Sequence, residues 1–328
     1  MTPVRTRTAL GFLIWLAALL AAASAVWLFQ GLGTGNRAFI IELRAVKLGA
    51  LITVGATIGV STILFQTVAA NRVLTPSIMG FDSLYVLLQT TLIATFGAAG
   101  FAAFPAVPKF LAEVAVMGVL AIILFGTLLG RGTRDIGRTI LTGVILGVMF
   151  RSTSNLIGRL IDPNEFAVVQ AASVVNFSRA NVDLLPIGGA LAGGAIALAL
   201  WLSPKLDVMA LGRDSATSLG LRYGPMVMLT LGLVSVLVAV ATALVGPMSL
   251  FGTAAFFGLV VAGMTHGLAQ SHRHAVLLPG AALVATNILV IGQMLFERVL
   301  HQQAALSIVI EFAGGLFFLY LLLKGRIR

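Results

Sequence analysis

The segment Leu48-Gly-Ala-Leu-Ile-Thr-Val-Gly-Ala-Thr-Ile-Gly-Val-Ser-Thr-Ile-Leu-Phe-Gln-Thr-Val-Ala-Ala70 decides the fold class of this chain. It carries no charged side chain over its whole length. An α-helix rises about 1.5 Å per residue, so about 20 residues cross the roughly 30 Å hydrocarbon layer of a bilayer. The segment is therefore long and apolar enough to be a membrane-crossing helix.

Similar apolar runs fill most of the remaining sequence. Of the 328 residues, 59% are hydrophobic and only 10% are charged, whereas a soluble domain carries about 25% charged residues. A lipid-embedded backbone must satisfy its own hydrogen bonds, which helices do, and the short alternating segments of outer-membrane strands are missing. The sequence predicts an all-α polytopic protein with about ten transmembrane helices in a single domain, residues 1–328. The runs span residues 9–31, 48–70, 78–96, 110–129, 140–157, 184–202, 223–245, 250–264, 275–294 and 304–323.

The basic residues indicate how the chain is oriented. The net charge is +10, but basic residues stand singly or in small groups between apolar runs, which argues against a nucleic-acid partner. Basic residues gather in cytoplasmic loops. With ten crossings and the N-terminus inside, thirteen of the 21 basic residues fall inside, so we expect both termini in the cytoplasm. The first run is too long for a signal-peptide core and is expected to stay as a helix.

Chemistry of other kinds has little support. The chain has no cysteine and no G-x-x-x-x-G-K-[ST] phosphate loop, so we predict no catalytic residue, no metal site, no cofactor and no ATPase site of its own. His272 and His274 could hold a metal weakly, but no carboxylate lies near them in sequence. A solvated loop explains these histidines better.

Three acidic residues keep an alternative open. Glu113, Asp82 and Glu311 fall in or beside apolar runs, and ionisable groups at membrane depth indicate function by default. They are compatible with a proton- or sodium-coupled secondary transporter that uses Asp82 and Glu311. Local pairing or helix capping explains the same residues, and this interpretation is favoured.

Three polar stretches interrupt the runs. On the outside, Asp162-Pro163 predicts a capped turn before a short helix over residues 166–177. On the inside, residues 204–222 predict two short helices, broken at Gly212 and closed at Gly220, with enough apolar surface for a protein partner. Between runs two and three, polar residues, Pro76 and Gly80 predict a tight turn or irregular backbone that is buried in protein.

Motifs in three regions together make the sequence specific. The first runs from Arg44 and Lys47 through the small-residue helix to Gln66, Asn71-Arg72 and Thr75-Pro76-Ser-Ile-Met-Gly80. The second is Leu211-Gly-Arg-Asp-Ser-Ala-Thr-Ser-Leu-Gly220, which matches the pattern L-G-x-x-x-A-x-x-L-G in full. The third joins Gly-Pro-Met-Ser at 246–249, Phe-Gly-Leu-Val-Val at 257–261 and Gly-Gly-Leu-Phe-Phe at 314–318. Over almost all of its length the chain resembles the FecCD family, the permease subunits of ATP-binding-cassette importers for iron–siderophore chelates, haem and cobalamin.

The resemblance implies a type II importer permease in a bacterial cytoplasmic (inner) membrane that moves an iron–siderophore chelate by alternating access. It implies a second permease chain, identical or related, two cytoplasmic ATPase subunits and an outer substrate-binding protein as partners. The residues implied to couple to the ATPase are Leu211, Gly212, Ala216, Leu219 and Gly220. Those expected to dock the binding protein are Arg44 and Lys47, with Arg298 added by location alone. Candidates for the translocation path or gate are Gly55, Gly59, Gln66, Pro76 and Gly80, although ordinary helix packing would also use the two helical glycines.

Overall fold

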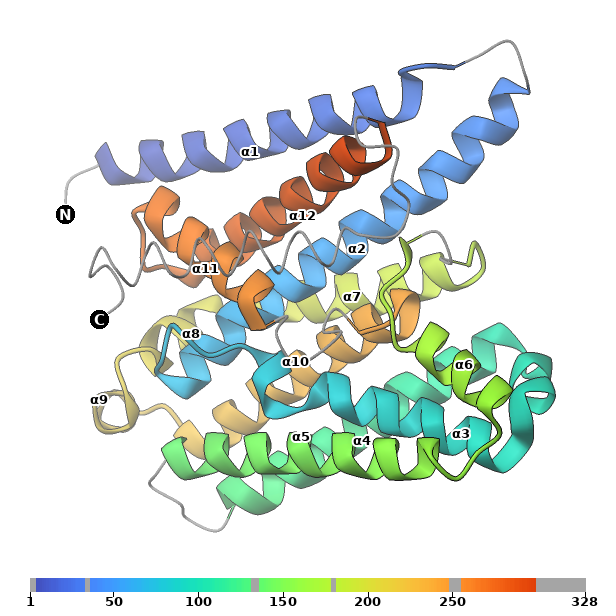
Figure 1. Ribbon diagram of the computed structural model, residues 1–328. Coiled ribbons are helices and arrows are strands. Elements are labelled where there is room, and N and C mark those ends of the chain that lie inside the picture. The colour runs from blue at the N-terminus through green and yellow to red at the C-terminus, as the bar shows by residue number, and fades with distance from the viewer. Residues whose placement is uncertain (1–3, 33–35, 131–135, 178–180, 248–254, 299–328) are drawn as a thin grey trace, which may run out of the picture.

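The computed structural model describes residues 4–32, 36–130, 136–177, 181–247 and 255–298, and within these ranges all regular structure is helical (Figure 1). The long helices are α1 (Val4–Phe29), α2 (Arg37–Ala69), α3 (Phe81–Ala103), α4 (Ala106–Gly130), α5 (Ile136–Gly158), α7 (Leu184–Trp201), α10 (Tyr223–Val245), α11 (Ala255–Ala269) and α12 (His274–Arg298). The short ones are the 3-10 helix η1 (Pro76–Met79), α6 (Pro163–Ala172), α8 (Ser203–Met209) and α9 (Arg213–Ser218).

The first nine apolar runs each coincide with one long helix. Six of these helices (α1, α2, α3, α7, α10 and α12) have the length and composition to cross a membrane. Helices α4 and α5 have 25 and 23 residues, and α11 has only 15, as the short eighth run predicts. The tenth run, residues 304–323, lies outside the described residues. The predicted all-helical fold class is confirmed.

Helix α2 is longer than its apolar run. It has 33 residues, or about 50 Å at 1.5 Å per residue, and begins at Arg37 instead of Leu48. The side chain of Asn36 accepts a hydrogen bond from the backbone N–H of Phe39 at 3.3 Å, which caps the helix. Charged residues in the first turns end the apolar run there, but the backbone remains helical. The helix therefore extends beyond the hydrocarbon layer at its N-terminal end or crosses it at a tilt.

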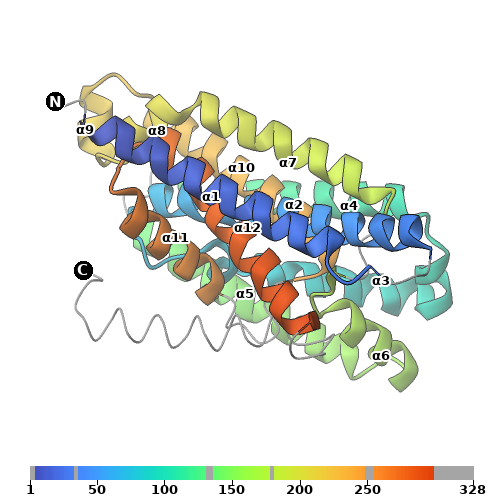
Figure 2. The same cartoon turned by 90° about the horizontal axis from the view of Figure 1, so that it is seen from above.

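Helix α2 also forms the centre of the bundle, where it packs against α12, α10, α7 and α1 (Figures 1 and 2). Gly55 and Gly59 make its close approach to α12 possible. A Cβ on Gly55 would lie 2.7 Å from the Cα of Thr286, and one on Gly59 would overlap the carbonyl of Ala281. These two glycines thus serve helix packing, and their predicted role in the translocation path remains a prediction.

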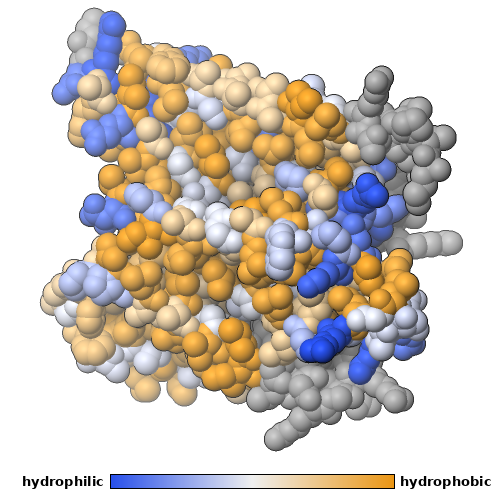
Figure 3. Space-filling view, turned by 180° about the vertical axis from the view of Figure 1, so that it is seen from behind, coloured by the Kyte–Doolittle hydropathy of each residue, from blue (hydrophilic) through white to orange (hydrophobic). Residues whose placement is uncertain are grey.

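The surface divides into an apolar middle and two polar ends (Figure 3). The N-terminus of α1 lies at the same end as α8 and α9 (Figure 2). At this end Thr67 of α2, His274 of α12 and Asp207 of α8 are in contact. This arrangement agrees with a topology that places the N-terminus and the α8–α9 segment on one side, which we call the inner end.

The remaining predicted segments form with small shifts. Helix α6 begins after Asp162, whose side chain accepts from the N–H of Asn164 at 2.8 Å, so the predicted cap is confirmed. The helix covers 163–172 instead of 166–177 because Ser173 ends it. Pro76 starts η1 and is buried, and Gly80 ends it with φ +84°. A Cβ on Gly80 would overlap the Cα of Gly147 in α5, so this irregular backbone is buried in protein.

Candidate functional site

The α8–α9 pair forms because proline and glycine punctuate a short inner segment. Pro204 lies in the first turn of α8, and Gly212 separates the helices with φ +92°, a conformation that favours glycine. Gly220 has φ +83°; its N–H donates to Thr217 and that of Leu221 donates to Ala216. These two bonds form a Schellman motif that closes α9. The predicted break and closure are both confirmed.

The apolar residues of this pair divide into exposed and buried sets. Leu211 and Leu219 are 60% and 64% exposed at the inner end. Ala216 is fully buried, in a helix that packs against α8 and α10. Its small size therefore lets α9 pack on its own chain, and the two leucines form the surface that a partner could contact. The coupling role of all five residues is a prediction that the structure leaves open.

The turn after α2 positions the inner ends of several helices. The amide of Gln66 donates to the carbonyl of Arg72, and the N–H of Asn71 donates to Gln66. These bonds fold the chain back toward η1 through an exposed turn at residues 70–72, and Gln66, Pro76 and Gly80 are themselves buried. Gln66 holds the turn after α2 and Gly80 packs on α5, whereas Gly55 and Gly59 lie earlier in α2, against α12.

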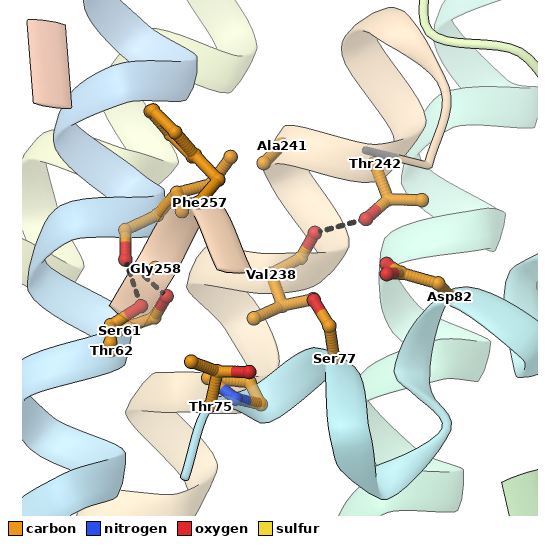
Figure 4. Close-up of a pocket in the computed structure, with 12 residues that line it drawn as sticks. Ser61, Thr62, Thr75, Ser77, Asp82, Val238, Ala241, Thr242, Phe257 and Gly258 are labelled. Atoms are coloured by element: carbon orange, nitrogen blue, oxygen red, sulfur yellow. Dashed lines mark hydrogen bonds between the residues drawn. The ribbon is translucent and has the colours of Figure 1, made fainter. Parts of the chain in front are cut away.

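A small cavity borders this segment (Figure 4). It has a volume of about 30 Å³ and is lined by Asp82, by the hydroxyls of η1, α2 and α10, and by Gly258 of α11. Asp82 is 6% exposed, and among the described residues its Oδ2 has no hydrogen-bond partner. The volume fits one or two water molecules and is far too small for a chelate.

A larger cavity of about 480 Å³ lies further toward the C-terminal end of α10, between α3, α4, α7 and α10. Glu113 borders it and accepts a hydrogen bond from Gln89 at 2.7 Å. Local pairing, the favoured interpretation of this acid, is confirmed for Glu113. Glu311 lies outside the described residues.

The three predicted docking cations gather at the outer end around Trp27. Arg44 donates to the carbonyls of Leu28 and Gln30 at 3.0 and 2.9 Å, and Arg298 donates to those of Trp27 and Gln30 at 2.9 and 2.6 Å. The three residues Arg44, Lys47 and Arg298, together with Trp27, are called the outer cluster below. The contacts of the two arginines fall on carbonyls at and just after the C-terminal end of α1, where a helix favours cations.

Lys47 has a different environment within this cluster. Its ammonium forms an ion pair with Glu297 of α12, and the two side chains are 13% and 26% exposed. It also lies 5.9 Å from the centre of the Trp27 ring. Much of its charge is therefore used inside the chain, so a docking role falls more to Arg44 and Arg298. The docking role of all three stays a prediction.

Sequence reasoning missed a polar group on α5. Arg151, Ser152, Thr153 and Asn155 are all exposed, and Arg151 reaches Ser83 of α3 at 3.4 Å. Polar side chains at membrane depth face protein or water rather than lipid. These four residues lie within the run 140–157, where the apolar pattern predicts a helix but does not single out its polar side chains.

The histidines near the inner end have a structural explanation. The ring of His274 contacts Asp207 and Thr67, so a carboxylate distant in sequence is close in space. Across the part of the chain that the structure describes, no group of three or more side chains could hold a metal ion. The inner end therefore combines packed helices, hydrogen bonds between helices and the exposed Leu211 and Leu219. Such an arrangement can carry a movement at the surface to the membrane helices.

Comparison with known proteins agrees with this geometry. A model of the FecCD transport family matches residues 8–324. The chain belongs to the FecCD transport family. The petrobactin import system permease protein YclO of Bacillus subtilis (strain 168) is 37% identical over 302 residues, which cover 91% of this chain and 93% of the relative. The petrobactin import system permease protein FatC of Bacillus anthracis is 33% identical over 287 residues, covering 88% and 79%.

A solved structure has the same fold. It is described as an inward-facing conformation of a metal-chelate type ABC transporter, and it aligns with a TM-score of 0.82 over 96% of this chain and 99% of the other. The sequence identity is 21%, so this likeness shows the fold. The predicted FecCD membership is thus confirmed by the family match, and the helical architecture by the structural one.

Proposed function

We propose that this chain is the membrane permease subunit of an ATP-binding-cassette importer that carries a ferric siderophore chelate of the petrobactin class. The observation that carries the proposal is the likeness, over nearly the full length, to YclO, a petrobactin import permease. The exposed leucines of the α8–α9 pair support it, because a permease without an ATPase site needs a surface through which a separate ATPase can act.

The chain would work as one permease domain, residues 1–328, in a bacterial cytoplasmic membrane. Of the two ATPase subunits of the complex, one would bind the α8–α9 pair of this chain through Leu211 and Leu219, which Gly212, Ala216 and Gly220 hold in place. A substrate-binding protein would dock at the opposite end on the outer cluster. No cofactor is assigned to this chain, since the partner subunits would bind ATP.

A second permease chain, identical or related, would complete the path. The polar group on α5 supports this part of the proposal, since its exposed Arg151 and Asn155 cannot stably face lipid. A water-filled path between two chains would hydrate them. Gly80, at the end of η1, packs against Gly147 of α5, and α2 contacts both η1 and α5, so a shift of α2 could reach the path directly.

The experiment is uptake of iron-55 in a strain that lacks this permease, complemented with the wild-type gene. A panel of ferric chelates, including petrobactin, a hydroxamate siderophore and citrate, identifies the cargo class. We expect uptake of petrobactin iron to be restored, and to be lost when the Walker A lysine of the partner ATPase is replaced. Restored uptake of another chelate class alone would overturn the cargo assignment, and uptake without a functional ATPase would overturn the transporter class.

A further inference from the structure

A buried chain of hydrogen bonds joins the α8–α9 pair to the two helices at the centre of the bundle. On α8, Asp207 Oδ1 lies 2.6 Å from Nδ1 of His274 and accepts the backbone N–H of His274 at 2.7 Å. On the other side of the ring, Nε2 lies 2.7 Å from Oγ1 of Thr67 in α2. One imidazole therefore contacts side chains from two other helices.

The protonation pattern follows from the partners. A carboxylate only accepts hydrogen bonds, so Nδ1 of His274 donates to Asp207. In the neutral ring Nε2 carries no proton and accepts from the Thr67 hydroxyl, which then gives up its alternative bond to the carbonyl of Ile63, 2.8 Å away. Asp207 also takes the N–H of the first residue of α12, a group that no bond within that helix can satisfy. Asp207 therefore caps α12 and orients its histidine at the same time.

Burial of the His274 ring makes its hydrogen bonds important for stability. His274 is 2% exposed, while the side chain of Asp207 is 35% exposed and reaches the inner surface. An imidazole buried in a bundle needs its partners, because each unsatisfied nitrogen loses its hydration without compensation. Apolar contacts also hold α8, since Leu206 and Met209 are each 1% exposed. The bonds are thus not needed to attach α8, and what they add is a fixed direction.

The position of each partner matters for transport. Thr67 lies in the last turn of α2, directly after Gln66, which holds the turn toward η1 and the buried Pro76–Gly80 segment. His274 is the first residue of α12. A displacement of α8 would therefore reach the inner ends of α2 and α12 together. Apolar side chains can slide past each other, whereas hydrogen bonds with fixed geometry cannot do so without breaking.

We propose that Asp207, His274 and Thr67 form a positioning network that makes the α8–α9 pair and the inner ends of α2 and α12 move as one unit when the ATPase changes state. The proposal rests on the proposed function, because it takes α8–α9 as the ATPase contact. The network would act without contacting nucleotide or chelate. They set how much of the ATPase motion reaches the membrane helices.

The test uses the complete complex of permease, ATPase and binding protein in proteoliposomes. The measured quantity is the number of ATP molecules hydrolysed per chelate transported, with ATPase co-purification and thermal stability recorded beside it. The variants are His274→Ala, which removes the ring, and Thr67→Val, which keeps the volume but removes the hydroxyl. The matched controls are His272→Ala, an exposed histidine in the same loop, and Thr67→Ser, which restores the hydroxyl.

We expect His274→Ala and Thr67→Val to raise the ATP cost per transported chelate about fivefold or more, the range of an ordinary coupling free energy. ATPase co-purification should be retained, and both controls should resemble wild type. When Asp207→Asn is combined with Thr67→Val, the increase in ATP cost should be smaller than the product of the two single increases, because both substitutions act through one ring. An unchanged ratio in Thr67→Val, or transport and hydrolysis that fall together in proportion to lost stability, would overturn the network.

Failure of the proposed function would look different. If the wild-type complex does not retain an ATPase, or hydrolyses no ATP during uptake, the transporter class is wrong before any variant is made. If the wild-type complex couples ATP hydrolysis to uptake, but Thr67→Val and Thr67→Ser show the same ATP cost per chelate, only the proposed network is wrong.

Discussion

The two ends of the bundle both link α2 to α12, but by different chemistry. At the outer end, Lys47 of α2 pairs with Glu297 of α12, and two arginines bind the last carbonyls of α1. At the inner end, a chain of hydrogen bonds runs from the carboxylate of Asp207 through the buried ring of His274 to the hydroxyl of Thr67. Between the ends, Gly55 and Gly59 hold the helices in direct backbone contact.

The difference indicates what each end can do. The outer contacts fix helices to one another and include no separate short element. The inner contacts include α8, whose neighbour α9 exposes Leu219 to a partner. We infer that the outer end serves as a fixed frame for docking, while the inner end receives motion from outside the chain.

The largest effect is expected where the inner end meets its partner. Leu211→Asp with Leu219→Asp should abolish ATPase co-purification and lower ATP-dependent uptake at least about tenfold, because desolvated apolar anchors carry most of an interface's energy. Both side chains are mostly exposed, so the unfolding temperature of the isolated permease should stay within about 2 °C of wild type. A pull-down and a melting curve check the two statements. Normal co-purification would show that the ATPase contacts another surface.

The second largest effect is expected on stability, at the contact of α2 with α12 between the two ends of the bundle. Gly55→Ala should destabilise the permease by about 1–3 kcal/mol, since its Cβ would overlap the backbone of α12. Gly189→Ala is the matched control, because the space around Gly189 on α7 is open. Unfolding in detergent by denaturant measures both. Equal stability of the two variants would contradict the close α2–α12 contact.

A smaller loss of stability is expected at the outer end. Lys47→Met should cost about 1–2 kcal/mol, because Glu297 keeps Gln293 as a hydrogen-bond partner but loses its cation. The double variant Lys47→Met with Glu297→Gln should recover part of that loss, since no unpaired charge remains. A double variant less stable than Lys47→Met alone would show that the ion pair does not hold α2 to α12.

The smallest effect concerns docking. Glu297→Gln removes the acid that neutralises Lys47, so an acidic binding protein should associate about two- to fivefold faster at low salt and no faster at high salt. Stopped-flow association with the purified binding protein measures this, with thermal stability as the control. An unchanged rate at low salt would leave the outer cluster with its structural role alone.

Much of this architecture could be predicted from the sequence, because lipid imposes strict rules on helix length and charge. The first nine apolar runs correctly predicted nine helices among the described residues. Gly212 and Gly220 correctly predicted the break and the closure of the α8–α9 pair. The start of α2 was predicted too late, because the helix begins at Arg37, on the N-terminal side of Leu48, where the apolar run begins. The exposed polar group on α5 was not recognised, because the surrounding apolar residues already explained the run 140–157 as a crossing helix.

The candidate site was harder to predict, because its contacts join residues far apart in the chain. Asp207 and His274 carry no local pattern that links them, and His274 was read as solvated when it is buried. Ala216, implied to couple to the ATPase, is buried where α9 packs on α8 and α10, and its coupling role stays a prediction. Sequence alone cannot distinguish these alternatives, since each depends on how α8 and α9 fold back onto the bundle.

We propose that partner ATPases, and no ion gradient, drive transport through this chain. The direct measurement is uptake of an iron-55 chelate into proteoliposomes containing the complete complex, with ATP supplied on the ATPase side. One sample receives ATP with all ion gradients collapsed, and the other receives proton and sodium gradients without ATP. The account predicts uptake only in the first sample. Uptake in the second alone would contradict it and would favour a secondary transporter that uses Asp82.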